Sequence, residues 1–359
     1  MTSSTVRPSW AAGAALALTQ GDPAGIGPEI IVKAYRGAPE LMRGVLVVGQ
    51  VAVLRRAAAV VAADGPALPV VWVASPADLA SVPPRCIPVL DPTPVDEPLG
   101  EVPAWGQVSA EAGRRAADAV VWAARAALQG AVGGVVTAPL HKEALHAAGG
   151  DYPGHTELLQ AEAARHAGVP LAEMPVRMML ANPELRTVLV SIHVSLRDAI
   201  EAVTYDNVLT TLRITHAALS RTLGRAPRIG VAGLNPHAGE GGLFGREEVD
   251  IIEPAVRAAR AQGLLVEGPI APDTVFMRAR DQAQRPGEFD VVVAMYHDQG
   301  LIPVKYLGVE QGVNVTLGLP LIRTSPDHGT AFDLAGTGRA DASSLIEALR
   351  MARQLIGAP

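Results

Sequence analysis

Short apolar runs that alternate with longer alanine-rich stretches constrain the fold of this chain more than any other feature. The apolar runs have the length of buried strands, and the alanine-rich stretches have the length of helices. The runs expected to be strands cover residues 15–18, 45–48, 70–73, 134–137, 176–180, 187–191, 228–233 and 291–294. The stretches expected to be helices cover residues 27–35, 50–63, 109–129, 156–167, 208–223, 247–262 and 343–355. This alternation predicts an α/β fold built of βαβ units, in which parallel strands are buried between helices.

The length of the chain predicts two domains, because 359 residues exceed what one hydrophobic core usually supports. We expect residues 1–14 to form a mobile tail. The first α/β domain is expected to be discontinuous, with residues 15–130 and 306–359, and the second α/β domain to cover residues 131–305 between them. Gly308 and Gly312 indicate the later boundary, because they could form a hinge there.

Charge and cysteine content argue against several classes of protein. The net charge of −6 disfavours nonspecific nucleic-acid binding, which needs a basic surface. Cys86 is the single cysteine, so no disulfide can form within the chain, as is typical of a reducing compartment. No segment contains the roughly 20 uninterrupted apolar residues of a membrane span. We therefore predict a cytoplasmic protein that binds neither nucleic acid nor a membrane.

Four of the nine histidines lie in short segments rich in turn-forming and polar residues: His155, His193, His237 and His297. The last three follow expected strands directly, and strand ends are where side chains of an open α/β fold converge on a ligand. Three imidazoles from separate strand ends could form a metal site with an open coordination position. The alternative for each histidine taken singly is a hydrogen bond to a loop carbonyl.

Two further motifs could bind a ligand. Residues 21–29 read Gly-Asp-Pro-Ala-Gly-Ile-Gly-Pro-Glu, a turn from a strand into a helix where the backbone can approach a ligand closely; the alternative is a tight turn without one. The chain lacks Gly-x-Gly-x-x-Gly, so a nicotinamide cofactor would bind without the usual Rossmann loop. Lys305, Asn314 and Arg323 could together hold a phosphate or carboxylate, although each alone could be an ordinary surface residue.

The sequence resembles the 4-hydroxythreonine-4-phosphate dehydrogenase family, called PdxA, from about residue 16 to about residue 355. Five blocks carry the resemblance in the same order, at residues 21–29, 154–157, 233–242, 295–300 and 323–330. The resemblance implies a two-domain α/β/α fold similar to the isocitrate and isopropylmalate dehydrogenases. It also implies a homodimer with its active site at the subunit interface, and we expect the second domain to supply most metal ligands and the interface.

The resemblance also implies roles for individual residues. It makes His193, His237 and His297 metal ligands. The implied substrate-binding residues are His155, Thr156, Lys305, Asn314 and Arg323. The implied cofactors are NAD or NADP and a divalent metal, and three imidazoles without a thiolate suit Zn, Co or Mn better than Mg. We expect Asp298 to accept a proton or to orient a histidine.

The implied reaction oxidises the C3 hydroxyl of 4-hydroxy-L-threonine 4-phosphate, followed by decarboxylation to 3-amino-2-oxopropyl phosphate in pyridoxal phosphate biosynthesis. The metal would lower the pKa of that hydroxyl while hydride leaves for the nicotinamide. Leu243 stands where the best-known members have His, and Val194 and Ser195 depart from the family pattern. These departures leave 4-phospho-D-threonate and 4-phospho-D-erythronate open as substrates. A metallohydrolase built on the three histidines is the alternative from another class.

Overall fold

The computed structural model describes residues 15–93, 101–150 and 152–357, so the tail expected at residues 1–14 lies outside the described residues. The chain forms two compact units: unit 1 is Met1–Met174 with Leu319–Ile356, and unit 2 is Pro175–Gly318 with Gly357–Pro359. The bounds of these units differ from those of the two expected domains. Residues 131–174 belong to unit 1 because the strand at 134–137 pairs with the first strand of the chain. Residues 306–318 belong to unit 2, where the strand at 313–317 pairs with the one at 177–181.

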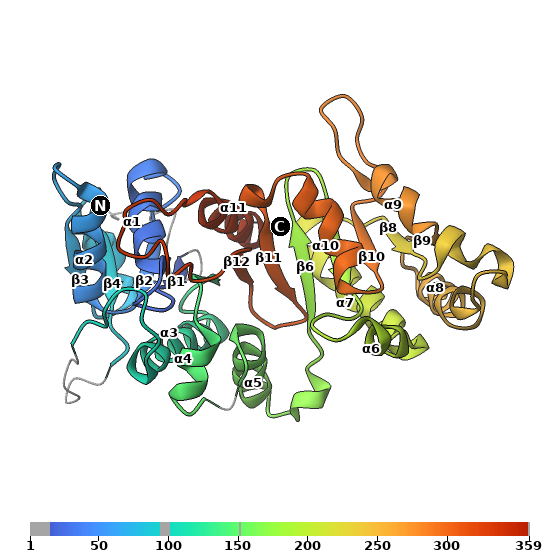
Figure 1. The fold of residues 1–359 in the computed structure, drawn as a ribbon, viewed down its shortest axis with the longest axis horizontal. Coiled ribbons are helices and arrows are strands. Elements are labelled where there is room, and N and C mark those ends of the chain that lie inside the picture. The colour runs from blue at the N-terminus through green and yellow to red at the C-terminus, as the bar shows by residue number, and fades with distance from the viewer. Residues whose placement is uncertain (1–14, 94–100, 151, 358–359) are drawn as a thin grey trace, which may run out of the picture. The chain divides into compact units, whose positions relative to one another are not determined.

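Unit 1 contains a parallel sheet with the strand order β3-β4-β2-β1-β5-β12 (Figure 1). Its strands are β1 (Leu16–Thr19), β2 (Val45–Val48), β3 (Val70–Trp72), β4 (Ile87–Leu90), β5 (Gly134–Thr137) and β12 (Arg323–Pro326). Its helices are α1 (Gly27–Gly37), α2 (Val51–Ala62), α3 (Ala110–Leu128), α4 (Lys142–Ala147), α5 (His155–Ala167) and α11 (Ser343–Gly357), with short 3-10 turns η1 (Pro76–Ser81) and η2 (Leu171–Glu173). All residues of β1, β2, β4, β5 and β12 are buried, as in a parallel sheet covered on both faces.

The order of the strands in unit 1 locates a ligand-binding edge. In register, Thr19 at the end of β1 lies opposite Val48 of β2 on one side and Thr137 of β5 on the other. The chain therefore leaves β1 toward one side of the sheet and later returns on the other side at β5. Open α/β sheets bind ligands at the carboxyl ends of strands where the order reverses in this way. The carboxyl ends of β1 and β5 are that position in unit 1.

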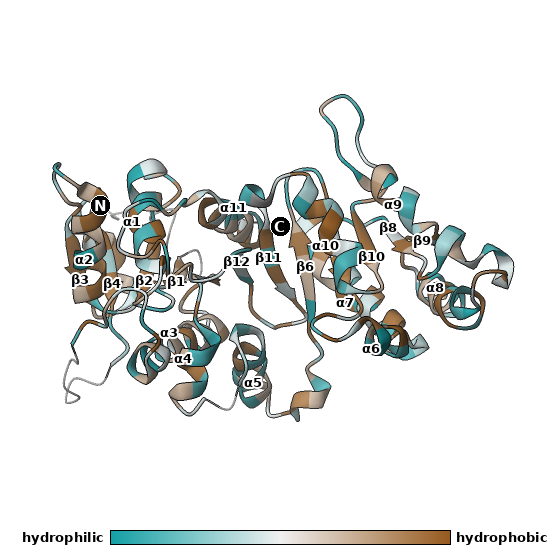
Figure 2. Cartoon of the chain, viewed as in Figure 1, coloured by the Kyte–Doolittle hydropathy of each residue, from teal (hydrophilic) through white to brown (hydrophobic). Residues whose placement is uncertain are grey.

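Unit 2 contains a sheet with the strand order β11-β6-β7-β10-β8-β9. Its strands are β6 (Arg177–Ala181), β7 (Arg186–Leu189), β8 (Ile229–Ala232), β9 (Val266–Ile270), β10 (Val291–Ala294) and β11 (Val313–Leu317). Its helices are α6 (Leu196–Glu201), α7 (Tyr205–Leu223), α8 (Glu253–Ala261), α9 (Pro272–Ala279) and α10 (His297–Tyr306); its shorter turns are η3 (Pro236–Gly242), η4 (Glu248–Ile252) and η5 (Val309–Gln311). Figure 2 shows the apolar strands between helices of mixed character, and the core of unit 2 includes Leu180, Leu189 and Val292.

One strand departs from the predicted parallel arrangement. β6 pairs antiparallel with both β7 and β11, whereas β7, β10, β8 and β9 are parallel neighbours. The cause is a tight turn between β6 and β7, in which Asn182 Oδ1 accepts hydrogen bonds from the backbone N–H groups of Glu184 and Leu185. The α/β class is confirmed, but the prediction of parallel strands was wrong for β6. Among the described residues, no helix combines the length and the apolar character needed to cross a membrane.

Candidate functional site

Three adjacent parallel strands of unit 2 lead to the three histidines expected to bind a metal. β10 lies between β7 and β8 and pairs in parallel with both of them. His193 follows β7, His297 follows β10 and His237 follows β8, each within five residues of the end of its strand. Because carboxyl ends of parallel strands meet at one edge of a sheet, all three chain segments leave the sheet at the same edge.

The structure brings two of these histidines together. The ring centroids of His193 and His297 lie 5.6 Å apart, with the rings tilted by 46°. His297 is not in a loop, because it is the first residue of α10. Its Nδ1 forms a 2.7 Å hydrogen bond with Asp298 Oδ1, which leaves Nε2 as the nitrogen that can bind a metal. The two histidines and Asp298 line a cavity of about 260 Å³, together with apolar residues that include Val194 and Leu196.

The third histidine lies apart from this pair. The His237 ring lies beside that of Phe244, with a centroid distance of 6.1 Å. In the part of the chain that the structure describes, no three His, Cys, Asp or Glu side chains gather closely enough to hold a metal ion. One chain by itself therefore does not assemble the three-histidine site, and the assignment of these ligands stays a prediction.

A glutamine that the sequence reasoning missed links the segments after β8 and β10. Gln299 lies in the first turn of α10, and its Nε2 donates to the backbone oxygen of Gly233 at 2.8 Å. Its Oε1 accepts a 2.7 Å hydrogen bond from the backbone N–H of Met295. A glutamine two residues after His297 gives no sequence signal for such a role. Elsewhere in unit 2, Lys305 is exposed near the end of α10, and Asn314 is half-buried on β11.

Unit 1 holds the remaining predicted residues around Arg323. The Arg323 side chain, on β12, is only 4% exposed, and its Nε and Nη2 donate to Thr137 Oγ1 at 3.2 and 2.8 Å. Burial lowers the pKa of this guanidinium to about 10, so it stays positively charged at neutral pH. His155 opens α5 and Thr156 follows it, so neither residue lies in a loop.

The His155 imidazole has an unusual electrostatic environment. Burial, and after it the charge of Arg323, holds the pKa of His155 well below its ordinary value of 6.5, although a hydrogen bond with the Ala138 backbone acts in the opposite direction. The ring is therefore neutral at pH 7. Its Nε2 is buried and has no hydrogen-bond partner among the described residues. A neutral imidazole and a buried guanidinium beside the first turn of α5 suit a polar, anionic ligand.

Other buried polar atoms at the carboxyl end of β1 escaped the sequence reasoning. Thr19 Oγ1 and Asp22 Oδ2 are buried and lack a hydrogen-bond partner among the described residues. Burial raises the pKa of the Asp22 carboxyl, whose Oδ1 accepts a hydrogen bond from the Ala24 N–H. Gly21 has φ of 71°, and a Cβ there would come within 2.3 Å of the Pro139 oxygen. The glycine-rich motif indicated this turn, but nothing in it distinguished Asp22 from an ordinary turn residue.

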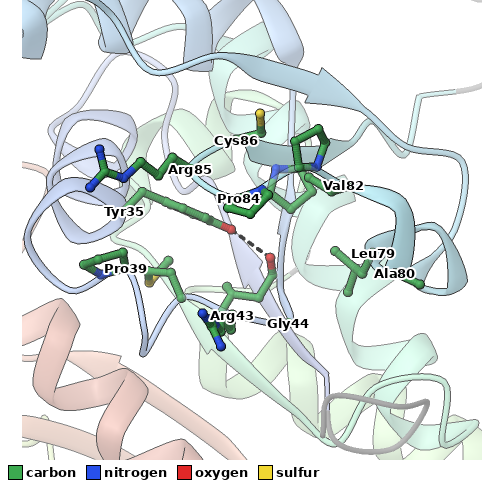
Figure 3. Close-up of a pocket in the computed structure, with 14 residues that line it drawn as sticks. Tyr35, Pro39, Arg43, Gly44, Leu79, Ala80, Val82, Pro84, Arg85 and Cys86 are labelled. Atoms are coloured by element: carbon green, nitrogen blue, oxygen red, sulfur yellow. Dashed lines mark hydrogen bonds between the residues drawn. The ribbon is translucent and has the colours of Figure 1, made fainter. Parts of the chain in front are cut away.

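A separate hollow in unit 1 lies away from these residues. It has a volume of about 230 Å³ and opens near the first residues of β2 and β4; Tyr35, Arg43, Arg85 and Cys86 are among its lining residues (Figure 3). The Tyr35 hydroxyl donates to the Val45 oxygen at 2.7 Å. None of the predicted site residues lines this hollow, and it lies at the amino ends of the strands rather than at their carboxyl ends.

Comparisons with known proteins agree on one family. The model of the family described as "Pyridoxal phosphate biosynthetic protein PdxA" matches residues 41–352. The chain is 52% identical to a 4-hydroxythreonine-4-phosphate dehydrogenase of Beijerinckia indica, over 95% of this chain and 94% of that protein. It is 45% identical to a D-threonate 4-phosphate dehydrogenase of Salmonella typhimurium, over 95% and 98%. A crystal structure of a 4-hydroxythreonine-4-phosphate dehydrogenase from Klebsiella pneumoniae superposes with a TM-score of 0.82 at 43% identity, covering 95% of this chain and 99% of that one.

Proposed function

Because the chain belongs to the PdxA family of pyridoxal phosphate biosynthetic proteins and is a dehydrogenase of that family, we propose that it oxidises 4-hydroxy-L-threonine 4-phosphate. A pyridine nucleotide accepts the hydride, and decarboxylation yields 3-amino-2-oxopropyl phosphate. The observation that carries the proposal is the pairing of His193 with His297 at adjacent strand ends, in a chain that is 52% identical to a named 4-hydroxythreonine-4-phosphate dehydrogenase. The second candidate substrate is D-threonate 4-phosphate, on which the Salmonella relative is named as acting.

The donor atoms of unit 2 fit a divalent metal. His193 and His297 offer two imidazoles, and Asp298 fixes the Nδ1 side of His297 so that Nε2 faces away from the carboxylate. Three imidazoles without a thiolate favour zinc, with cobalt and manganese next and magnesium last. When bound, such a metal supplies Lewis-acid stabilisation of a substrate alkoxide. The hydrogen bond to His297 supports the role of Asp298 as an orienting residue more directly than a role as proton acceptor.

We propose that the partner subunit's His237 is the third ligand, which makes the active enzyme a homodimer. The absence, among the described residues, of any three His, Cys, Asp or Glu side chains close enough to hold a metal supports this arrangement. Exposed apolar side chains support it too: of the thirteen exposed large hydrophobic residues in the described part of the chain, ten lie in unit 2. Val194 and Leu196 lie beside His193, and Leu243 and Phe244 follow His237 in the next turn, with Leu243 73% exposed. A surface of this kind is typical of a protein–protein interface.

Positive and polar residues of both units suit the anionic groups of the substrate. In unit 1, Arg323 supplies a permanent positive charge, and the unpartnered Nε2 of neutral His155 is available to a substrate group. Thr156 adds a hydroxyl beside it. In unit 2, Lys305 supplies an exposed ammonium and Asn314 a side-chain amide. We propose that these five residues bind the substrate's phosphate and carboxylate groups, which holds the C3 hydroxyl in place for hydride transfer.

We place the pyridine nucleotide at the carboxyl end of β1. The support is the strand-order reversal there, the glycine-rich turn that follows, and the unpartnered polar atoms of Thr19 and Asp22. Asp22→Asn should then raise the KM for the nucleotide, and an unchanged KM would contradict this placement. A cytoplasmic location remains our expectation from the single cysteine.

The proposal is tested by the absorbance of reduced nicotinamide. Purified enzyme receives NAD or NADP and either 4-hydroxythreonine 4-phosphate or D-threonate 4-phosphate, with and without a chelator. We expect nucleotide reduction with a higher kcat/KM for the first substrate, and its loss on chelation. A higher kcat/KM for the second substrate would move the assignment to the threonate branch. Substrate consumption without nucleotide reduction would point to a metallohydrolase instead.

A further inference from the structure

The segment after β8 has an unusual backbone conformation that neighbouring groups must stabilise. His237, Ala238, Gly239, Glu240 and Gly241 have φ of 53°, 52°, 77°, 43° and 67° in succession, so five consecutive residues lie in the left-handed region. Three of them carry side chains, and each such residue costs free energy in this conformation. A left-handed turn of this length persists only where neighbouring groups hold it.

The side chain of Glu248 provides that support. Glu248 is only 2% exposed, and its Oε1 accepts hydrogen bonds from the backbone N–H groups of Leu234 and Asn235, each at 2.7 Å. Its Oε2 accepts a further bond from Asn235 Nδ2 at 3.0 Å. The same Nδ2 donates to Glu247 Oε2 at 2.6 Å. Three hydrogen bonds accepted by one buried carboxylate thus fix the chain immediately before the left-handed turn begins.

The carboxylate also packs directly against the turn itself. A Cβ at Gly239 would come within 2.6 Å of Glu248 Oε2, and a Cβ at Gly233 within 3.1 Å of Oε1. The turn is closed on its other side by Phe244, whose backbone N–H donates to the Gly239 oxygen at 3.1 Å. The Glu248 carboxylate therefore packs against the backbone of both Gly233, before the turn, and Gly239, within it.

The local structure around Glu248 is itself irregular. Glu248 is the first residue of η4, a π-helical turn that continues into α8. Such π-turns accommodate an extra residue in a helix and occur frequently at functional sites. The sequence predicts a regular helix over residues 247–262. It indicates neither this irregularity nor the contact of the Glu248 carboxylate with the preceding loop.

We propose that Glu248 is the positioning residue for His237. Its carboxylate holds the left-handed turn of residues 237–241 in the one conformation that presents the His237 imidazole to the metal of the partner subunit. Glu248 itself touches neither metal nor substrate. This inference rests on the proposed function, in which His237 is a metal ligand.

Glu248→Gln is the informative substitution, because it keeps the size of the side chain and changes one acceptor into a donor. If the remaining side-chain oxygen still accepts from the backbone N–H groups of Leu234 and Asn235, the new amide nitrogen faces Asn235 Nδ2. Both of these nitrogens are donors, so no hydrogen bond can form between them. Rotating the Asn235 amide does not relieve this conflict, because Asn235 Nδ2 also serves Glu247. The turn then loses part of its support while the packing volume stays the same.

Two glycine variants of the same turn provide a matched pair. Gly239→Ala places a Cβ 2.6 Å from Glu248 Oε2 and 3.0 Å from the Gly245 oxygen, whereas the Cβ of Gly241→Ala meets no atom within 4 Å. Both residues have a left-handed φ, 77° and 67°, so both variants carry similar backbone strain. A difference between them therefore reports the contacts made at position 239, of which Glu248 Oε2 is the nearest, and not strain alone.

The experiment measures the affinity of each purified variant for Co²⁺ by its visible absorbance, together with the thermal unfolding of the metal-free protein. We expect Glu248→Gln and Gly239→Ala to weaken Co²⁺ binding by about 10- to 100-fold, as loss of a residue that supports a ligand does. Gly241→Ala should bind within about threefold of the wild-type protein, a change small beside that loss. His237→Ala serves as the reference for complete loss of one ligand.

The outcomes separate this inference from the proposed function. If Glu248→Gln and Gly239→Ala melt at a lower temperature but bind Co²⁺ like the wild-type protein while folded, Glu248 is merely structural and the inference is overturned. If Gly241→Ala loses as much affinity as Gly239→Ala, contact with Glu248 is not the cause and the inference is again overturned. If His237→Ala binds Co²⁺ normally, His237 is not a ligand, and the proposed metal site fails together with the role of Glu248.

Discussion

The imidazole rings of His193 and His297 lie with their centroids 5.6 Å apart, although 104 positions separate the two residues in the sequence. The pairing follows from the sheet, because β7 and β10 are parallel neighbours and each histidine follows the end of one of them. In the proposed function, these two imidazoles, one of them held by a carboxylate, are part of the ligand set of a metal. The central claim of the proposed function is that a second subunit completes this set.

His193→Ala should abolish metal-dependent turnover and leave the fold intact. The His193 side chain is exposed, so its removal costs little packing, whereas a Lewis-acid metal contributes several kcal/mol to catalysis. We expect a fall in kcat of about 100-fold or more, together with loss of bound metal in elemental analysis. The control is His166→Ala, an exposed histidine on α5. Wild-type turnover and metal content in the His193 variant would remove this residue from the site.

Asp298→Asn should weaken metal binding without unfolding the protein. The carboxylate accepts a hydrogen bond from His297 Nδ1 at 2.7 Å, and an amide is a poorer partner for an imidazole that donates charge to a metal. We expect the metal affinity to fall by about 10- to 100-fold, as measured by titration calorimetry. Asp273→Asn, in the first turn of α9, should leave the affinity unchanged. Equal affinity in both variants would contradict an orienting role for Asp298.

Arg323→Lys should raise the KM for the phosphorylated substrate more than it lowers kcat. The guanidinium is buried and directs two nitrogens at Thr137 Oγ1, a geometry that a single ammonium cannot reproduce. Charged hydrogen bonds contribute about 1.5–3 kcal/mol each, so we expect a KM roughly 10- to 100-fold higher in steady-state kinetics. Arg257→Lys, on the exposed side of α8, provides the control. A KM equal to that of the wild-type enzyme would exclude Arg323 from substrate binding.

The histidine at the start of α5 should make stability depend on pH. The pKa of His155 is below 6.5 in the folded protein, so below about pH 6.5 the unfolded chain binds a proton that the folded chain does not. The free energy of unfolding therefore falls as the pH is lowered from about 7 to 5, by at most about 1.4 kcal/mol per pH unit from this residue. His155→Gln should make that decline shallower in urea unfolding, whereas His146→Gln, an exposed residue of α4, should not. Parallel declines in all three proteins would mean that His155 is not held neutral.

Apolar pattern was sufficient to predict the strands that consist of continuous apolar runs. Val45–Val48, Gly134–Thr137 and Val291–Ala294 are continuous apolar or β-branched runs, and the structure has strands at those residues. β12 escaped prediction because Arg323–Pro326 is polar and includes a proline, although it is buried in the sheet. α10 escaped because it begins at a histidine and contains Pro303, which local propensity disfavours.

For the candidate site, the sequence indicates residue types but not their geometry. Strand ends indicate His193, His237 and His297, because the carboxyl ends of parallel strands share an edge. The sequence could not show that His237 lies apart, since this depends on the left-handed turn and on contacts with Glu248 that come from another segment. The neutral state of His155 likewise depends on Arg323, 168 positions away in the chain.

The most direct test of the central claim is complementation between two inactive variants. His297→Ala and His237→Ala are each expected to lose metal-dependent nucleotide reduction. If the partner subunit's His237 completes the site, a mixed dimer contains one intact site and one that lacks both ligands. Random exchange of equal amounts should therefore restore about a quarter of the wild-type activity per site, because half of the dimers are mixed. No recovery after verified subunit exchange would show that all three histidines act within one chain, and would contradict the proposed site.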